Sequence, residues 1–136
     1  MRARRAALDA LEAVRARDAY ANLVLPAVLA RHRLTGADAA RATDLTYGTL
    51  RALGTLDRII AACSSRPLRR LDAATLDVLR LGSLQLLAGR AAVLAAVSTS
   101  VDLAQERASR GSAGFVYAVL RGVSTRVLDG GPAQLC

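Results

Sequence analysis

The segment Gly114-Phe115-Val116-Tyr117-Ala118-Val119-Leu120-Arg121 carries the clearest structural signal in the chain. Large apolar residues recur in it at the spacing of one helical face, and the pattern continues for another turn. The spacing predicts a helix over residues 113–127, with an inward face made of Phe115, Val116, Val119 and Val123. A helix with such an apolar stripe is stable in water only when the stripe packs against other elements.

The same periodicity, followed outward from this segment, predicts further helices along most of the chain. We expect them over residues 3–16, 20–33, 36–53, 56–63, 73–87 and 95–107, with no strand. Asp72 is a good N-cap for the fifth helix and Gly89 a good end for it. Pro26 indicates that the regular part of the second helix begins nearer Leu23, and residues 109–112 are typical of a turn. Six or seven short helices with short loops predict a compact all-α domain.

The composition agrees with an all-helical fold. The chain has 136 residues, of which 53% are hydrophobic and only 3% aromatic, so its core must consist mainly of Ala, Leu and Val. Ala and Leu favour helices, whereas the β-branched and aromatic residues that favour strands are a minority. A chain of this length predicts one domain, which we place over residues 1–128, with residues 129–136 as a disordered tail or the start of a linker.

The charge balance points to an anionic partner. The chain holds 19 Lys and Arg residues against 11 Asp and Glu residues, for a net charge of +8, and all 19 are arginine. Codon bias in a GC-rich genome accounts for the missing lysine, but not for the excess of basic residues. Nucleic acid is the commonest partner of such a domain; general stickiness and an acidic protein partner are the alternatives.

Several kinds of site and location are disfavoured. Two cysteines, Cys63 and Cys136, and one histidine, His32, are too few for a structural zinc site or a disulfide framework. The charged N-terminus has no signal-peptide pattern. The longest apolar run, Ala91–Val97, is far shorter than the ~20 residues that span a bilayer. We therefore expect a cytoplasmic protein that binds neither metal nor membrane.

Several segments, taken in order, resemble one known family. They are Asp18–Pro26, Tyr47–Arg51 followed by Leu56-Asp57, Leu79–Leu87 and Gly114–Arg121. Together they resemble the NusB-like family of all-helical RNA-binding domains, and within it the N-terminal domain of Sun/Fmu-type ribosomal RNA cytosine-C5 methyltransferases. The resemblance implies a NusB-like bundle of six to seven helices in two packed three-helix subdomains, which agrees with the helices predicted above.

The chain departs from the family pattern in three places. Tyr117 stands where the family usually has Asn, Leu84 where an aromatic is usual, and Val93-Leu94 in a stretch that commonly holds Pro and His. An Asn side chain near a helix start can satisfy free backbone groups, and Tyr cannot do so in the same way. The family role of this position is therefore not carried over to Tyr117.

The resemblance implies that this chain alone is not an enzyme. Such methyltransferases carry a second domain that binds S-adenosylmethionine and supplies a cysteine nucleophile, and neither its Gly-rich cofactor turns nor its catalytic cysteine is present here. Cys63 lies in an Ala-rich apolar segment and is interpreted as a core or half-buried thiol, and Cys136 has no base beside it. We expect no catalytic residue and no cofactor in this chain, with S-adenosylmethionine implied for an absent second domain.

The candidate RNA-contact residues are all arginines: Arg2, Arg4, Arg5, Arg66, Arg69, Arg70 and Arg121. The first three resemble the basic residues near the first helix of NusB-like proteins, and they also fit a solvated helix end with Arg5 paired to Asp9. The next three cluster in a loop beside Pro67, which fits either a phosphate contact or a plain exposed loop.

Two arginines in the family-like segments have a structural interpretation. Arg80 and Arg121 lie beside apolar positions, so their stems can pack on the core. This favours structural pairs, for example with Asp77 or Asp44, over RNA contacts, although Arg121 stays among the candidates.

The few aromatic residues and two of the glycines are also read as structural. Tyr20 and Tyr47 are expected in the core or in an interface rather than stacked on bases. Gly48 and Gly82 are expected to permit close helix packing.

The sequence thus predicts a binding module that docks an rRNA cytosine-C5 methyltransferase on small-subunit rRNA. Its expected partners are RNA, ribosomal in origin, and a C-terminal methyltransferase domain or a ribosomal protein. One alternative is a free-standing NusB-like antitermination factor that binds leader RNA and a ribosomal protein. Another is a degenerate helical domain for protein interaction with no role in RNA binding.

Overall fold

The chain forms seven α-helices and no strand within residues 1–89 and 92–130, the part that the computed structural model describes, with side chains to residue 128. The helices are α1 (Arg2–Arg17), α2 (Ala21–Arg31), α3 (Gly36–Arg51), α4 (Leu53–Cys63), α5 (Ala73–Ala88), α6 (Val93–Arg107) and α7 (Arg110–Gly130). A single 3₁₀ turn, η1 (Leu68–Arg70), lies between α4 and α5. The all-α fold and the number of helices predicted from the sequence are confirmed.

The chain divides into two compact units, one ending at Arg51 and the other beginning at Ala52. In the first unit α1 packs on α2 and α3, and α2 also contacts α3. Its core combines small alanines with larger aliphatic residues: Ala6, Ala10, Val24, Leu25, Val28, Leu34 and Ala42. Because alanine side chains are short, these helices approach closely, which is the core expected from a chain with so few aromatics.

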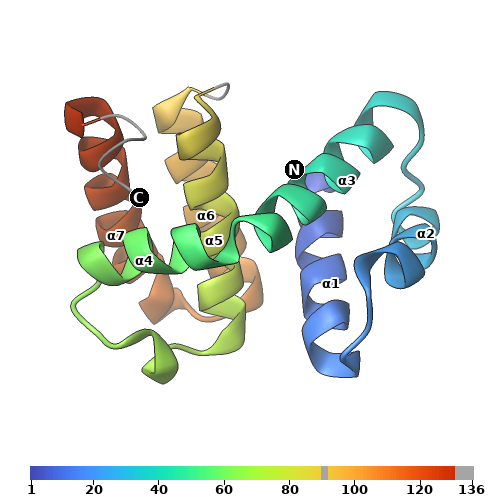
Figure 1. Cartoon of the computed structure of the whole chain (residues 1–136), viewed down its shortest axis with the longest axis horizontal. Helices are drawn as coiled ribbons and strands as arrows, with labels where there is room; N and C mark the ends of the chain where they lie inside the picture. The colour runs from blue at the N-terminus through green and yellow to red at the C-terminus, as the bar shows by residue number, and fades with distance from the viewer. Residues whose placement is uncertain (90–91, 131–136) are drawn as a thin grey trace. The chain divides into compact units, whose positions relative to one another are not determined.

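The second unit contains α4, α5, α6 and α7. Figure 1 shows α5, α6 and α7 running side by side, with α4 crossing α5 and α7. Its core is built from fully buried aliphatic side chains, with a large contribution from the segment around residues 114–121: Leu56, Ile60, Leu79, Leu103, Val116, Val119, Leu120 and Val123. Three of the four residues predicted to face inward on α7 are fully buried, and Phe115 is half-buried.

Gly82 lies where α5 packs tightly against α6 and α7. A Cβ atom at this position would lie 2.7 Å from Ser100 Oγ on α6 and 2.9 Å from Leu120 Cδ1 on α7. Atoms do not approach so closely without displacement, so any side chain here would push α5 away from its two neighbours. The expectation that Gly82 permits close helix packing is confirmed.

The ends of α5 agree with the sequence, and two other helix ends differ. The Asp72 side chain caps α5, and Gly89 ends it in the left-handed conformation at φ 69°. By contrast, α4 begins at Leu53, so Gly54 lies in its first turn and does not break the chain there. Helix α7 begins at Arg110, because the predicted turn is a helix cap, described below.

Proline is tolerated inside α2. The helix runs from Ala21 to Arg31 with Pro26 in its interior, so the predicted delay of its start to Leu23 is wrong. Proline lacks the N–H that would bond the carbonyl of residue 22. Both residues are exposed, so water can satisfy that carbonyl. At the other end of the chain, residues 129–130 belong to α7, and the tail expected to continue through 131–136 lies outside the described residues.

Candidate nucleic-acid interface

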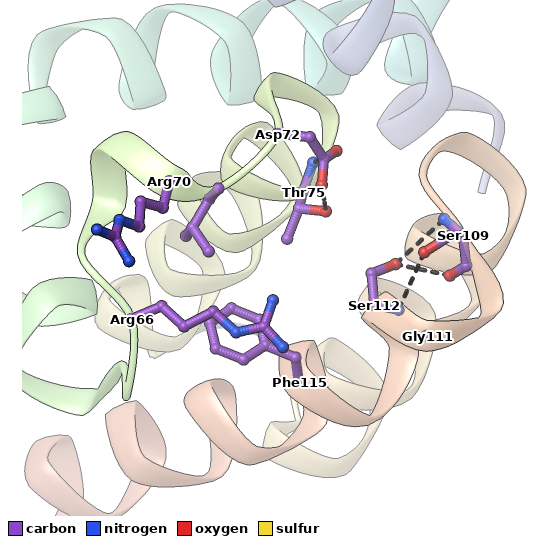
Figure 2. Close-up of a pocket in the computed structure, with 9 residues that line it drawn as sticks. Arg66, Arg70, Asp72, Thr75, Ser109, Gly111, Ser112 and Phe115 are labelled. Carbon is purple, nitrogen blue, oxygen red and sulfur yellow. Dashed lines mark hydrogen bonds between the residues drawn. The ribbon is translucent and has the colours of Figure 1, made fainter.

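A cavity of about 260 Å³ opens on the second unit, between the loop that follows α4 and the start of α7. Figure 2 shows the side chains around it. Basic, hydroxyl and aromatic groups converge on this space from three segments: Arg66, Arg70, Thr75, Ser109, Ser112 and Phe115. The site is therefore polar and cationic, with one aromatic surface.

Arg66 is held in place on both its backbone and its side chain. Its amide donates to Ser64 Oγ at 3.1 Å, and the Ser64 hydroxyl donates to the Arg66 carbonyl at 2.7 Å. The guanidinium carbon lies 4.8 Å from the centroid of the Phe115 ring, a cation–π contact. In Figure 2 the Arg66 side chain extends across that ring toward the space between Thr75 and Ser112, so its charge lies at the cavity.

The start of α7 forms another wall of the cavity. Ser109 and Ser112 cap the helix reciprocally: the Ser112 amide donates to Ser109 Oγ at 3.2 Å, and the Ser109 amide donates to Ser112 Oγ at 3.3 Å. This is a capping box with Ser in place of the usual Glu. It explains why the helix begins at Arg110. The positive end of the helix dipole adds to the local positive potential.

Asp72 supplies the only carboxylate among the cavity-lining residues. Its Oδ2 accepts a hydrogen bond from the Thr75 amide at 3.0 Å, and its Oδ1 accepts one from the Thr75 hydroxyl at 2.7 Å. Burial opposes ionisation of this carboxyl, but the hydrogen bonds from Thr75 outweigh it and hold the pKa of Asp72 below its ordinary value. Asp72 is therefore an anion at neutral pH, with both oxygens engaged in capping α5.

Two of the three loop arginines predicted from the sequence meet at the cavity. We call Arg66, Arg69 and Arg70 the arginine loop. All three are exposed, and within the described residues no carboxylate pairs with any of them. Arg66 and Arg70 line the cavity, whereas Arg69 lies outside it. Since only Asp72 carries an opposing charge at the cavity, the local balance is positive.

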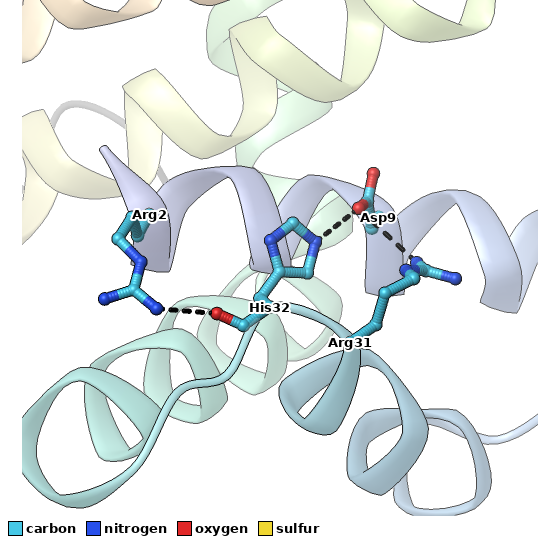
Figure 3. A network of polar contacts seen from close by, with 4 residues as sticks. All are labelled: Arg2, Asp9, Arg31 and His32. Carbon is cyan, nitrogen blue, oxygen red and sulfur yellow. Dashed lines mark hydrogen bonds and ion pairs between the residues drawn. The ribbon is translucent and has the colours of Figure 1, made fainter.

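Arg2, by contrast, is used within the fold. Its guanidinium donates to the carbonyl of His32 at 2.7 Å and to that of Arg33 at 3.1 Å, at the C-terminal end of α2. Figure 3 shows this contact beside a second one, in which His32 Nε2 lies 2.6 Å from Asp9 Oδ2. Arg31 also reaches that carboxylate, at 3.4 Å. These contacts tie α1 to the end of α2.

Arg4 and Arg5 are half-buried on α1, and both interact with other groups of the protein. Burial, together with repulsion from Arg41 on α3, lowers the pKa of Arg4. Arg4 therefore lies close to Arg41, a neighbour that sequence reasoning missed. No pattern in the sequence brings Arg41 to α1, because only the packing of α3 on α1 does so.

Arg80 forms the structural pair expected of it. Its Nε and a terminal nitrogen donate to the two oxygens of Asp57 at 2.8 and 2.9 Å, and Asp77 lies 3.6 Å away. Burial works to lower the pKa of Arg80, but the bond to Asp57 and the nearby Asp77 raise it. The pairing with Asp77 is confirmed, and the bidentate partner is Asp57 rather than Asp44.

Arg121 and the tyrosines behave differently from one another. Arg121 is exposed and lies over the Tyr117 ring at 6.0 Å from its centroid. None of the described carboxylates pairs with it, so the structural acid pair favoured for Arg121 is wrong. Tyr47 packs half-buried against the core of the first unit, as expected. Tyr20 is 78% exposed and so lies outside the core, and the alternative that it belongs to an interface stays a prediction. It precedes α2 at the N-cap position, outside the buried face of that helix.

Cys63 is half-buried, and its Sγ lies 3.2 Å from where a Cβ of Gly122 would be, which fits the half-buried thiol predicted from the sequence. Over the described ranges, no three His, Cys, Asp or Glu side chains gather to hold a metal ion. None of the helices described is long and apolar enough to cross a membrane.

Sequence reasoning missed the partners that complete the cavity, namely Phe115, Ser109, Ser112 and Thr75. The Ser-x-x-Ser spacing at residues 109–112 carries a detectable capping signal. The approach of Phe115 to Arg66 carries none, since the two are far apart in the sequence.

Two solved structures share this fold. A chain in the crystal structure of a plectonemic RNA supercoil superposes with a TM-score of 0.86 at 22% identity, over 95% of this chain and 96% of that one. T. maritima NusB superposes with a TM-score of 0.85 at 21% identity, over 98% and 94% of the two chains. Identities this low establish the fold alone, and the fold is the NusB-like bundle that the sequence predicted.

Sequence comparison identifies the family. A putative methyltransferase of Mycobacterium tuberculosis is 54% identical over 124 residues, which is 91% of this chain and 27% of that protein. The ribosomal RNA small subunit methyltransferase B of Thermus thermophilus is 40% identical over 81% of this chain, and the probable enzyme of Synechocystis is 32% identical over 88%. The chain spans only 27% of the length of each of these relatives. The NusB family model matches residues 1–125, and the chain therefore belongs to the NusB family.

Proposed function

We propose that this chain is the RNA-binding module that docks a ribosomal RNA cytosine-C5 methyltransferase on small-subunit rRNA. The observation that carries the proposal is the arginine loop, which presents three exposed guanidinium groups without a paired carboxylate among the described residues. Three like charges within five residues of one loop repel one another, and the phosphates of a nucleic acid relieve that repulsion. The net charge of +8 acts over longer range in the same direction.

The comparisons support the methyltransferase part of the proposal. Relatives at 54%, 40% and 32% identity are named as methyltransferases, and two of those names specify the small ribosomal subunit. Because the chain corresponds to about a quarter of each relative, a further domain would bind S-adenosylmethionine and carry out the reaction. These names favour a docking module over a free-standing antitermination factor. The proposed work on ribosomal RNA fits a cytoplasmic location.

The proposed mechanism is one of affinity and orientation. Phosphate contacts fix the position of an RNA without reading its sequence. By holding the RNA beside a tethered catalytic domain, the module would raise the effective concentration of the target cytosine at the active site. No residue of this chain takes part in bond making or breaking in this scheme.

The test is a titration of the chain with a small-subunit rRNA fragment, a large-subunit rRNA fragment and a leader RNA at several salt concentrations. If four to six phosphates are engaged, affinity should fall roughly fiftyfold to two-thousandfold over a fourfold rise in salt. We expect the small-subunit fragment to bind most tightly. Preference for the leader RNA would favour the antitermination function, and the absence of salt-dependent binding to any RNA would refute the proposal.

A further inference from the structure

The guanidinium of Arg66 is a flat surface presented to the cavity. Its carbon lies 4.8 Å from the centroid of the Phe115 ring, so the ring supports one side of the group. Phe115 is half-buried and fixed on α7, while the Arg66 backbone is held by two hydrogen bonds to Ser64 Oγ. The side chain is therefore more restrained than an ordinary surface arginine. RNA-binding proteins stack unpaired bases on arginine planes of this kind.

The polar groups around the Arg66 guanidinium can bind the sugar and the phosphate of a nucleotide. The Ser109 hydroxyl oxygen accepts a hydrogen bond from the Ser112 amide at 3.2 Å. Among the described groups, none accepts a hydrogen bond from the Ser109 hydroxyl, so that hydroxyl is free to donate one to a ligand. Arg70 lines the same cavity, and in Figure 2 its guanidinium lies on the far side from Ser109. The one anion, Asp72, has both carboxylate oxygens bonded to Thr75. Cationic and donor groups thus dominate the free hydrogen-bonding capacity of the cavity.

The size of the cavity limits what it can hold. Its volume of about 260 Å³ lies just below the range of roughly 300–1,000 Å³ that is typical of small-molecule sites. A double helix cannot enter such a space, and neither can several stacked bases. One base, with its sugar and phosphate at the opening, matches both the volume and the lining.

We propose that this cavity receives one unpaired nucleotide of a bound RNA, with its base stacked on the Arg66 guanidinium and its phosphate facing Arg70. The inference deepens the proposed function and rests on it, since it names the feature of the RNA that the module selects. A base held in this way completes a three-layer stack of Phe115, guanidinium and base. The module then favours RNA with a bulged or single-stranded nucleotide over a continuous duplex.

The experiment compares Arg66 with its neighbour Arg69, which is an exposed arginine of the same loop outside the cavity. Arg66→Lys, Arg66→Ala and Arg69→Ala are titrated at fixed ionic strength with a single-stranded RNA, with the same sequence as a blunt duplex, and with that duplex carrying one bulged nucleotide. Lysine keeps the charge of arginine but lacks its plane. Circular dichroism confirms that each variant is folded.

We expect the wild-type protein to bind the bulged and single-stranded RNAs at least roughly fivefold more tightly than the duplex, the low end of measured stacking effects. Arg66→Lys and Arg66→Ala should both abolish this preference, whereas Arg69→Ala should weaken all three RNAs equally and leave the ratio unchanged. Inorganic phosphate, used in place of chloride at equal ionic strength, should not compete with the RNA for binding.

Three results would overturn the inference while leaving the proposed function intact. They are a wild-type protein that binds all three RNAs equally, an Arg66→Lys variant that keeps the preference, and strong competition by inorganic phosphate, which would make the cavity a general anion site. Failure of the wild-type protein to bind any RNA in a salt-dependent way would refute the proposed function and this inference together.

Discussion

Two groups of arginines with the same sequence signature have opposite environments in this protein. Near the N-terminus, Arg2 donates to two backbone carbonyls of its own unit, and Arg4 and Arg5 are half-buried and each interact with another group of the protein. The arginine loop has no carboxylate partner in the described part of the chain and borders a cavity. A count of basic residues therefore overstates the charge that is available to a partner. Availability depends on which acceptors the fold brings within reach.

The largest expected effect separates the two groups directly. Replacing the whole arginine loop by alanine should lower RNA affinity roughly hundredfold near 0.1 M salt and reduce the slope of log affinity against log salt by about two to three, since three positive charges that neutralise the RNA backbone are lost. The free energy of unfolding should stay within about 0.5 kcal/mol of the wild type, as expected for exposed side chains. Filter binding and denaturant titration measure the two quantities.

The control for that experiment removes the same charge elsewhere. Arg17, Arg51 and Arg126 are exposed on other helices, and replacing all three by alanine changes the net charge equally. An equal loss of affinity in the two triple variants would show that net charge, and not the arginine loop, governs binding.

Arg80 provides the contrasting case, an arginine that is paired with the carboxylates of Asp57 and Asp77. Arg80→Met should lower the free energy of unfolding by about 1–3 kcal/mol, between the values for surface and buried ion pairs, because it leaves Asp57 without its bidentate partner. RNA affinity of the folded protein should be unchanged. Urea denaturation followed by RNA titration below the transition checks both statements, and a drop in affinity would place Arg80 in the binding surface.

Arg2 tests whether the N-terminal group is structural. Arg2→Ala removes two hydrogen bonds to the end of α2 and should cost about 1 kcal/mol of stability. Arg69→Ala, the matched exposed arginine, should cost less than about 0.5 kcal/mol and have the larger effect on RNA affinity. Thermal unfolding and RNA titration measure the two effects. A larger loss of stability in Arg69→Ala, or a larger loss of RNA affinity in Arg2→Ala, would contradict the roles assigned to the two groups.

The smallest effects concern Asp72, the anion beside the arginine loop. Asp72→Ala removes the cap of α5 and should cost about 1 kcal/mol at pH 7. The pKa of Asp72 is lower in the folded protein than in the unfolded chain, where it is near 4. The ionised Asp72 therefore stabilises the folded protein fully at pH values above the unfolded pKa, and this stabilisation is lost as pH falls through the folded pKa. The wild type and the variant should therefore converge in stability at the acidic end of a pH series of unfolding measurements.

The companion variant Asp72→Asn keeps a good N-cap and removes only the charge. It should raise RNA affinity roughly twofold to threefold at low salt, with an effect that fades as salt screens the cavity. A loss of affinity would mean that the carboxylate itself accepts a hydrogen bond from the RNA.

Local patterns in the sequence were sufficient for the number and approximate positions of the helices, but not for all of their ends. The apolar spacing around Val116 and Val119 predicts a buried face, and Asp72 and Gly89 carry cap signals that act within one turn. The start of α7 was misplaced because two serines can cap one another, a variant of a pattern usually recognised by its Glu.

The candidate site was only half predictable. The arginine loop is visible as a cluster of charges, but the contact of Arg66 with Phe115 joins residues almost fifty positions apart, as their numbers show. The acceptors of Arg2 lie 30 and 31 positions away in the sequence, and the bidentate partner of Arg80 lies 23 positions away. Contacts between separate helices depend on packing geometry, which a single sequence does not state.

The position of α7 has a consequence for the order of events during synthesis. The first unit has all of its helices once residue 51 has left the ribosome. The second unit lacks a wall of its core until the segment from Val116 to Val123 emerges, because α7 packs on α4, α5 and α6. Until that segment emerges, the parts of those three helices that α7 covers stay exposed, and exposed apolar surface of this kind makes a nascent chain prone to aggregation.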